Sequence, residues 1–345
     1  MQLRKTTLRT AVAALLAAVA IAGPGAAPAL AEDDVAWTVR TASNTYGADR
    51  SSYSYAVNPG GQVKDAMVVA NRGKAPLNLT VYAGDGYTTG GGHLDLVTRD
   101  KKSVAVGAWL KADAATVAIQ PGQTAEVPFT LSVPANATPG DYAGGIVTSL
   151  VQPDAAQSIN VERRLGIRVK LRVGGDLHPA LAVEGLTVTY AGGDATVTYT
   201  IHNTGNAILS AQQSASVAGP FGWWRRDAGA ISAPPELLPG ESWPVKATVH
   251  GVDRALLLTA TVTLTPRLTD ESGSTTSLPD VTASADTWVV PWTALILLVV
   301  VIALVAGGFL LLRRNRARGR AREDARVKEA VEQALAAEKS KSKAG

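Results

Sequence analysis

The feature that most constrains this chain is an uncharged, apolar run at residues 289–312. As a helix it would be about 36 Å long, enough to cross a hydrocarbon core of roughly 30 Å. Trp288 and Trp292 stand at its start, where indole rings favour the headgroup layer. Six arginines within residues 313–322 follow the run, and such a basic flank stays in the cytoplasm. We therefore predict a single-pass protein of the cell membrane, with its N-terminal region outside and its C-terminal tail inside.

The start of the chain predicts export. Arg4, Lys5 and Arg9 form a positive segment, an apolar run follows at residues 11–22, and the small residues Ala29 and Ala31 mark a cleavage site. The apolar run is too short to span a bilayer, so residues 1–31 read as a secretory signal peptide.

The charge distribution argues against nucleic-acid binding. The whole chain has a net charge of +4, but residues 32–288 hold 19 Lys and Arg against 24 Asp and Glu, a net −5. Residues 313–345 hold 11 against 5, a net +6. The basic character therefore reflects membrane topology and an attraction of the tail to anionic lipid, rather than a nucleic-acid interface.

The residue types needed for metal or covalent chemistry are sparse. The chain has no cysteine, which excludes thiol catalysis and Cys-based zinc sites. Its four histidines, His93, His178, His202 and His250, form no close ligand pair, and no serine-hydrolase motif is present. We predict no cofactor, no metal and no catalytic residue, although paired carboxylates could still meet in space.

The exported region has the pattern of β-structure. Short runs rich in Val, Thr and Ala are separated by Pro-Gly and Gly-Gly turns, as at residues 63–69 and 127–133. Residues 186–190 and 195–201 form a hairpin pattern around residues 192–194. Many short strands at this spacing predict an all-β fold of immunoglobulin-like sandwiches.

An internal repeat indicates two such domains. Asn71 and Gly73 match Asn203 and Gly205, each pair lying between two strand-like runs. A Pro-Gly turn follows in both halves, at residues 121–122 and 239–240. The spacing from Asn to Pro is 50 residues in the first half and 36 in the second, which predicts an insertion near residues 84–115.

These observations give a domain plan. The signal peptide is followed by a first immunoglobulin-like domain and then by a second, and a short spacer leads into the membrane helix and a basic tail of helical composition. The predicted bounds are 1–31, 32–175, 176–282, 283–288, 289–312 and 313–345. Val327, Val331 and Leu335 form a narrow apolar stripe in the tail, which could face a partner helix or the inner leaflet. A solvated charged helix is the alternative.

The first half resembles a known family. The resemblance rests on residues 53–62 with 68–71, on the Gly-rich segment 81–94, and on the pattern Pro-Gly-Asp-Tyr-x-Gly-Gly-Ile at residues 139–146. Residues 35–173 are similar to the domain of unknown function 916, the peptidoglycan-binding domain of WxL-interacting surface proteins, here in a membrane-anchored form of actinobacterial type. The resemblance implies two immunoglobulin-like domains, one C-terminal span, and binding of the first domain to cell-wall glycan.

Exposed-looking aromatic residues are the candidate ligand-binding residues. In the second half, two tryptophans and two arginines follow one another in a predicted loop, and in the first half three aromatics lie in or beside the insertion. Aromatic rings stack on sugars and arginines pair with carboxylates. The alternative in the first half is core packing, and in the second half it is that one tryptophan fills the core and the other rests near the membrane. The candidates are Trp223, Trp224, Arg225, Arg226, Tyr82, Tyr87 and Trp109.

Three functional hypotheses follow. The first is a non-enzymatic surface protein that binds peptidoglycan or another cell-wall glycan, or assembles complexes with other surface proteins. The second is a membrane-anchored accessory subunit that binds a protein outside and a partner or lipid inside. The third is an extracytoplasmic hydrolase.

Overall fold

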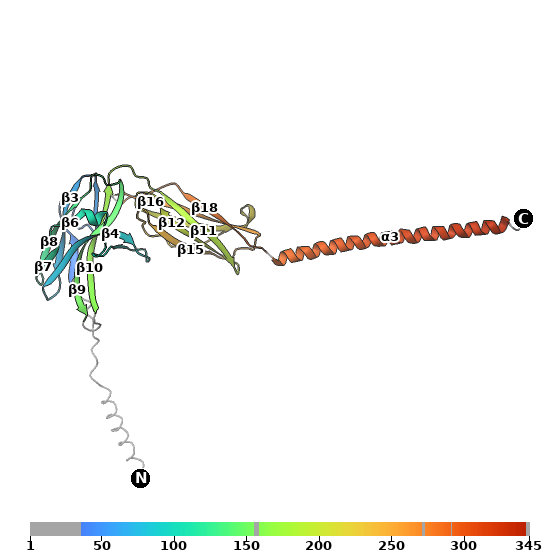
Figure 1. Cartoon of the computed structure of the whole chain (residues 1–345), viewed down its shortest axis with the longest axis horizontal. Coiled ribbons are helices and arrows are strands. Elements are labelled where there is room, and N and C mark those ends of the chain that lie inside the picture. Colours follow the sequence, from blue (N-terminus) through green and yellow to red (C-terminus); the bar gives the residue numbers. More distant parts are fainter. Residues whose placement is uncertain (1–35, 155–158, 271–272, 291, 343–345) are drawn as a thin grey trace, which may run out of the picture.

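The computed structural model describes residues 36–154, 159–270, 273–290 and 292–342, so the predicted signal peptide lies outside the described residues. Figure 1 shows two β-sandwiches followed by one long helix that leads away from them. We refer to the sandwiches as domain one (residues 37–173) and domain two (residues 181–288). The all-β, immunoglobulin-like fold with a C-terminal helix is confirmed.

Domain one is built from two sheets. Antiparallel pairing gives the first sheet the order β1-β3-β8-β6, with bounds Trp37–Thr41, Gln62–Asn71, Thr124–Ser132 and Leu110–Ala112. The second sheet has the order β2-β10-β9-β4-β5, with bounds Tyr53–Val57, Ile159–Val173, Gly140–Asp154, Leu77–Thr88 and Leu94–Leu96. Strand β7 (Thr116–Ile119) also pairs with β4, the short helix α2 (Val106–Trp109) precedes β6, and β2 runs parallel to β10.

Domain two is also a sandwich of two sheets, and all its described strand pairs are antiparallel. One sheet has the order β11-β12-β15, with bounds Leu181–Ala191, Asp194–Asn203 and Ser242–Val249. The other has the order β14-β13-β16-β17, with bounds Arg226–Asp227, Leu209–Ala218, Leu257–Thr269 and Thr275–Ser277. Strand β18 (Val281–Trp288) pairs with β16, and a single 3-10 turn, η1 (Pro220–Gly222), follows β13.

Each domain has its own hydrophobic core. Trp37, Tyr53 and Phe129 are the largest fully buried side chains of domain one, and Tyr199 is the largest of domain two. Strand β10 shows how the alternation of sequence produces the core, because Ile167, Val169, Leu171 and Val173 point inward. The intervening residues of this strand, including Arg168, therefore face outward.

The hairpin predicted at residues 186–201 is confirmed as β11 and β12. The prediction of a spacer is wrong, because residues 283–288 belong to β18, which pairs with β16 along its whole length as far as Trp288. The start of the helix also differs from the prediction. Helix α3 (Trp292–Ser342) begins at Trp292, while the N–H of Val289 still donates to the Leu256 carbonyl at 3.1 Å. Because of this hydrogen bond, domain two extends to Val289, close to the N-terminal end of the helix.

Helix α3 continues through the predicted tail without a break. Its first part is long and apolar enough to cross a membrane, and in that part no side chain is buried against protein. The following residues are mostly Arg, Ala, Glu and Lys, which favour helix and provide no stop signal. The apolar segment and the basic tail therefore form one helix.

Candidate functional site

The two domains meet through polar groups, among them the buried carboxylate of Asp141. Asp141 at the start of β9 accepts hydrogen bonds from the Arg172 Nε and Nη2 atoms at 2.6 and 2.9 Å. The same carboxylate accepts the N–H of Ile208 in domain two at 3.0 Å, and the Asp141 N–H donates to the Asn206 carbonyl at 2.7 Å. The Asp141 carboxylate therefore accepts hydrogen bonds from both domains.

Asn206 continues this contact on the other side. Its amide nitrogen donates to the carbonyls of Pro139 and Asp176, at 3.0 and 2.9 Å, and its amide oxygen accepts the N–H of His178 at 2.6 Å. Gly140 is required at this point, because its φ is +144° and a Cβ there would lie 2.5 Å from the Asn206 carbonyl oxygen. Gly140 of the motif at residues 139–146 therefore allows the close contact between the two domains.

A second polar contact joins the domains through the β4–β5 hairpin, residues 84–96, which we call the flap. Glu241 of domain two accepts the N–H and the hydroxyl of Thr88, at 2.8 and 2.6 Å. The glycine-rich tip of the flap approaches Pro235 and Trp243 at Gly92. The flap is therefore held by domain two as well as by β4.

The flap folds over the outer face of the second sheet of domain one. This close approach is allowed because Gly145 and Gly166 leave room for the Leu96 side chain. Asp85 secures the base of the insertion by accepting N–H bonds from Val104 and Gly107, at 2.6 and 2.7 Å. The glycine pair at residues 144–145, quoted above for the family resemblance, is thus explained by packing.

A groove lies between the flap and the outward face of β10. One part, about 330 Å³, is lined by Leu94, Leu96 and Arg164 among others. A second part, about 270 Å³, reaches Lys170 and the domain-two residues Glu236 and Leu238. The two parts share Leu94 and Arg168. We call this continuous surface the flap groove, defined by Leu94, Leu96, Arg164, Arg168, Lys170 and Glu236.

Three cations from alternate positions of β10 line the flap groove. Arg164 lies 3.7 Å from Asp95 and donates to the Leu96 carbonyl at 3.3 Å, and the nearby Tyr82 hydroxyl raises the pKa of Arg164. Lys170 pairs with Glu236 at 2.9 Å. Arg168 is exposed and forms no ion pair with the residues that the structure describes. Its guanidinium is available to a carboxylate-bearing ligand.

Two of the predicted ligand-binding residues lie beside this groove. Tyr82 contacts Arg164, and the hydroxyl of Tyr87 lies 3.4 Å from Asp95, whose carboxylate faces Arg164. Trp109 does not join them. Its ring packs on the edge of the core against Tyr142, with a centroid distance of 5.0 Å, so it belongs to the core side of the sheet.

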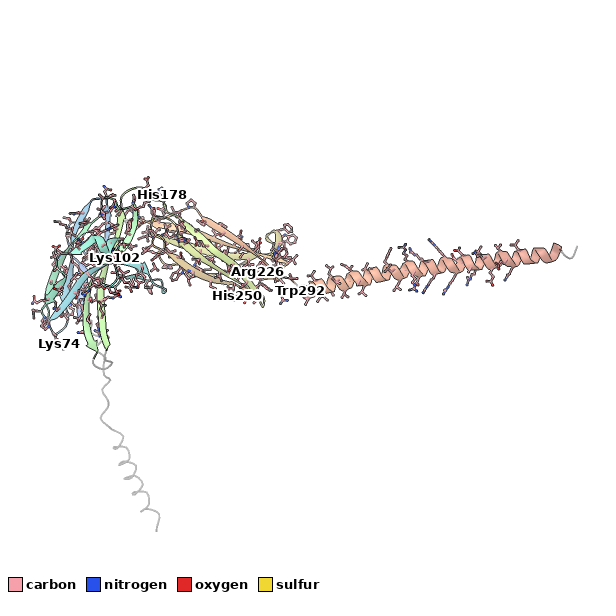
Figure 2. All side chains as sticks on the ribbon, in the orientation of Figure 1. Lys74, Lys102, His178, Arg226, His250 and Trp292 are labelled. Carbon is pink, nitrogen blue, oxygen red and sulfur yellow. The ribbon has the colours of Figure 1, made fainter. Side chains whose placement is uncertain are left out.

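The other four predicted residues follow η1 directly in domain two, and Figure 2 places Arg226 at the end of that domain next to α3. Trp223 and Trp224 are 58 % and 55 % exposed, with ring centroids 5.7 Å apart. Arg225 lies 3.4 Å from Asp227, and Arg226 donates to the Gly251 carbonyl at 3.1 Å. Apart from Trp109, the candidates therefore divide between two separate surfaces and do not form one site.

Sequence reasoning missed Asp95, Arg164 and the polar contacts between the domains. The outward placement of Arg168, Lys170 and Arg172 on one strand was the available signal, because alternate basic residues on a strand share one face. The described residues contain no group of three or more His, Cys, Asp or Glu side chains that could hold a metal ion.

Comparisons with known proteins give weak similarities. No family model matches, and no curated protein matches. Among solved structures, the chain is similar to the class 5 fimbriae chaperone CfaA, with 10% identity, 74% of this chain and 100% of that chain covered, and a TM-score of 0.36. It is also similar to the Pseudomonas aeruginosa CupB2 chaperone, with 11% identity, 67% and 96% covered, and a TM-score of 0.33.

A glycoside hydrolase of family 123 from Clostridium perfringens matches with 14% identity, over 40% of this chain and 27% of that chain, and a TM-score of 0.28. Because all three TM-scores are below 0.5, none of these similarities carries an argument about function.

Proposed function

We propose that this chain is a non-enzymatic surface protein, anchored by α3, that binds cell-wall peptidoglycan through the flap groove of domain one. Export by the N-terminal segment and retention of the arginine flank in the cytoplasm would place both sandwiches outside the membrane. The resemblance of residues 35–173 to the domain of unknown function 916 supports the same ligand.

The observation that carries the proposal is the chemistry of the flap groove. Arg168 presents an unpaired guanidinium, Arg164 and Lys170 stand on either side of it, and Leu94 and Leu96 supply an apolar wall. Peptidoglycan combines peptide carboxylates with apolar sugar faces and methyl groups. A guanidinium pairs with a carboxylate through two parallel hydrogen bonds, so the groove fits a stem peptide better than a neutral glycan.

The test is co-sedimentation of the full-length chain, in detergent micelles, with purified protein-free sacculi. We expect the wild type to pellet with sacculi and the double variant R164A/R168A to bind at least about tenfold more weakly, a loss of about 1.4 kcal/mol. The matched control is R225A/R226A, which removes the same charge from the other surface. Equal binding by wild type and R164A/R168A would show that the flap groove does not bind sacculi. Weaker binding by R225A/R226A instead would place the glycan on the aromatic loop, residues 221–226.

A second candidate function is assembly with another surface protein, and one feature of β9 and β10 favours it. Beyond Ser149 and before Val169 these strands pair only with each other, because the pairing of β9 with β4 ends at Ser149 and the pairing of β10 with β2 begins at Val169. The resulting two-stranded ribbon, visible at the end of domain one in Figure 1, exposes Val151 and Val161. Open strand edges can pair with a strand of a partner.

Photocrosslinking from residue 151 in intact cells tests this candidate. A discrete crosslinked protein, absent when the photoreactive residue is at Lys74, would support assembly. A V151E/V161E variant that loses that partner while still binding sacculi would separate the two functions.

A further inference from the structure

Three segments meet at the end of domain two that adjoins α3. Strand β13 reaches this end at Ala218, which pairs with Thr259, and β16 begins there at Leu257. Strand β18 ends there at Trp288, which pairs with Leu257. The loop that contains η1 follows β13 directly. Figure 2 places Arg226 and His250 at this same end, close to Trp292.

The exposed large apolar side chains of domain two are concentrated at this end. Among the described residues of domain two they are Phe221, Trp223, Trp224, Leu256 and Trp288, which we call the membrane-proximal patch. Phe221 is 91 % exposed and Trp288 is 69 % exposed. No other large apolar side chain of domain two is exposed among its described residues, so the five residues form a localised feature and not the scattered exposure expected of any surface.

The backbone of the loop holds these rings outward at a cost. Phe221 and Trp224 have φ values of 60° and 53°, a left-handed conformation that bulky residues rarely adopt. The Gly219 N–H donates to the Trp223 carbonyl at 2.7 Å, and Trp224 packs on Gly219, where a Cβ would lie 2.9 Å from the ring. Strained backbone conformations persist where the surroundings impose them, frequently at functional surfaces.

The chain leaves little distance between this patch and the membrane helix. Val289 is still hydrogen-bonded to Leu256, and α3 begins at Trp292. Three residues, fully extended, span about 10 Å at most. If α3 crosses a bilayer, the patch must stand within roughly that distance of its outer surface, because no longer linker exists.

The charges around the patch suit a phospholipid surface. Arg225, Arg226 and Arg254 are exposed, and the carboxylates near them lie at loose distances, 3.4 Å for Asp227 and 3.8 Å for Asp253. Exposed pairs of this kind are weak, so the guanidinium groups can exchange to lipid phosphates. Tryptophan rings favour the headgroup layer, and Phe and Leu side chains favour the acyl boundary beneath it.

We propose that the membrane-proximal patch inserts into the outer headgroup layer of the same bilayer that α3 crosses. Domain two is then held on the membrane at two points, the helix and the η1 loop, and cannot swing freely relative to α3. This inference rests on the proposed membrane anchoring. It assigns Trp223 and Trp224 to lipid and not to glycan.

The test uses the full chain reconstituted in phosphatidylcholine and phosphatidylglycerol vesicles. Because the chain has no cysteine, single variants F221C, K74C and V300C can each carry one environment-sensitive fluorophore. We expect the fluorescence emission of the label at 221 to shift to shorter wavelength when vesicles are present. A nitroxide near the lipid headgroup should quench that emission about twofold, since interfacial side chains reach about 5–10 Å into the lipid. Lys74, on domain one, should show neither change.

Position 300 separates the two proposals. If the label at 300 is quenched by a nitroxide deep in the acyl chain while the label at 221 behaves like that at 74, the anchor stands and the docking of the patch is wrong. If the label at 300 is not quenched, anchoring fails and the docking fails with it. A response at 221 that requires peptidoglycan fragments, or that scales with protein density in vesicles, overturns the proposal in favour of a glycan or a second copy.

Discussion

Asn71 of domain one and Asn203 of domain two occupy the same place in the two sandwiches and make the same hydrogen bonds. Each amide nitrogen donates to two carbonyls, Ala75 and Ile119 for Asn71, and Ala207 and Leu237 for Asn203, all at 2.8–2.9 Å. Each amide oxygen accepts the N–H of the glycine two residues on. Both side chains are buried, so each joins the turn between two strands of different sheets to the following Pro-Gly segment.

This relationship predicts that N71D and N203D each destabilise their own domain. A carboxylate cannot donate the two hydrogen bonds, and its charge would be buried without a cation. Losing two buried hydrogen bonds, at roughly 0.5–1.5 kcal/mol each, together with burying the charge should lower the free energy of unfolding by about 3 kcal/mol. Urea unfolding followed by tryptophan fluorescence measures it. N78D, on an exposed position of β4, should change stability by less than about 0.5 kcal/mol.

The repeat that contains these two asparagines was readable in the sequence because its Asn-x-Gly turn is a local pattern. Asn-x-Gly turns and alternating strands obey short-range rules, and both halves preserve them. The contacts of Asp141 with Ile208 and of Glu241 with Thr88 join residues 67 and 153 positions apart, and no local pattern predicts such pairs. The same limit hid Arg164, whose role arises only when the flap folds over β10. The aromatic loop could be recognised in the sequence from its clustered aromatic residues. Its position beside α3 could not, because that position depends on how β16 pairs with β18.

The hydrogen bonds of Glu241 to Thr88 predict a defined angle between the domains. In E241A the Thr88 N–H and hydroxyl lose their acceptor, so the flap should detach from domain two and the domains should move relative to each other. Electron paramagnetic resonance between spin labels on K74C and H250C measures this as a broader distance distribution.

The matched control for that experiment is E236A, which removes the ion pair with Lys170. Both partners of that pair are partly exposed, and such pairs contribute about 0–1 kcal/mol. We expect its distance distribution to resemble that of the unmodified chain. A broad distribution in all three proteins would mean that the contact does not fix the angle.

Asp65 predicts acid sensitivity in domain one. Its side chain is fully buried, and although burial alone would raise its pKa, hydrogen bonds from Arg50, Tyr55 and the Ala66 N–H hold the pKa below its usual value. A lowered folded-state pKa contributes stability that is present above the unfolded value, about 3.9, and is lost as pH falls through the folded value.

We therefore expect the free energy of unfolding to decrease below about pH 4, and D65N to flatten that dependence. At neutral pH D65N should lose roughly 3 kcal/mol, because Arg50 loses its buried partner. Urea midpoints across pH 3–6 measure both effects, with the exposed Asp113→Asn as the control. An unchanged acid slope in D65N would show that another carboxyl group governs the transition.

The packing of the flap on Gly145 predicts that a single methyl group disturbs the groove. A Cβ at Gly145 would lie 2.5 Å from Leu96 Cδ1 and 2.8 Å from the Ile167 carbonyl oxygen. The backbone oxygen cannot move without disturbing β10, so G145A must displace Leu96 and cost ~1–3 kcal/mol. We expect faster amide hydrogen exchange at residues 94–97 and weaker binding to sacculi. Gly90→Ala, at the flap tip where nothing lies within 4 Å, should leave both unchanged. Weaker binding in G145A with unaltered exchange would mean that the groove, and not the flap, responds to the added methyl group.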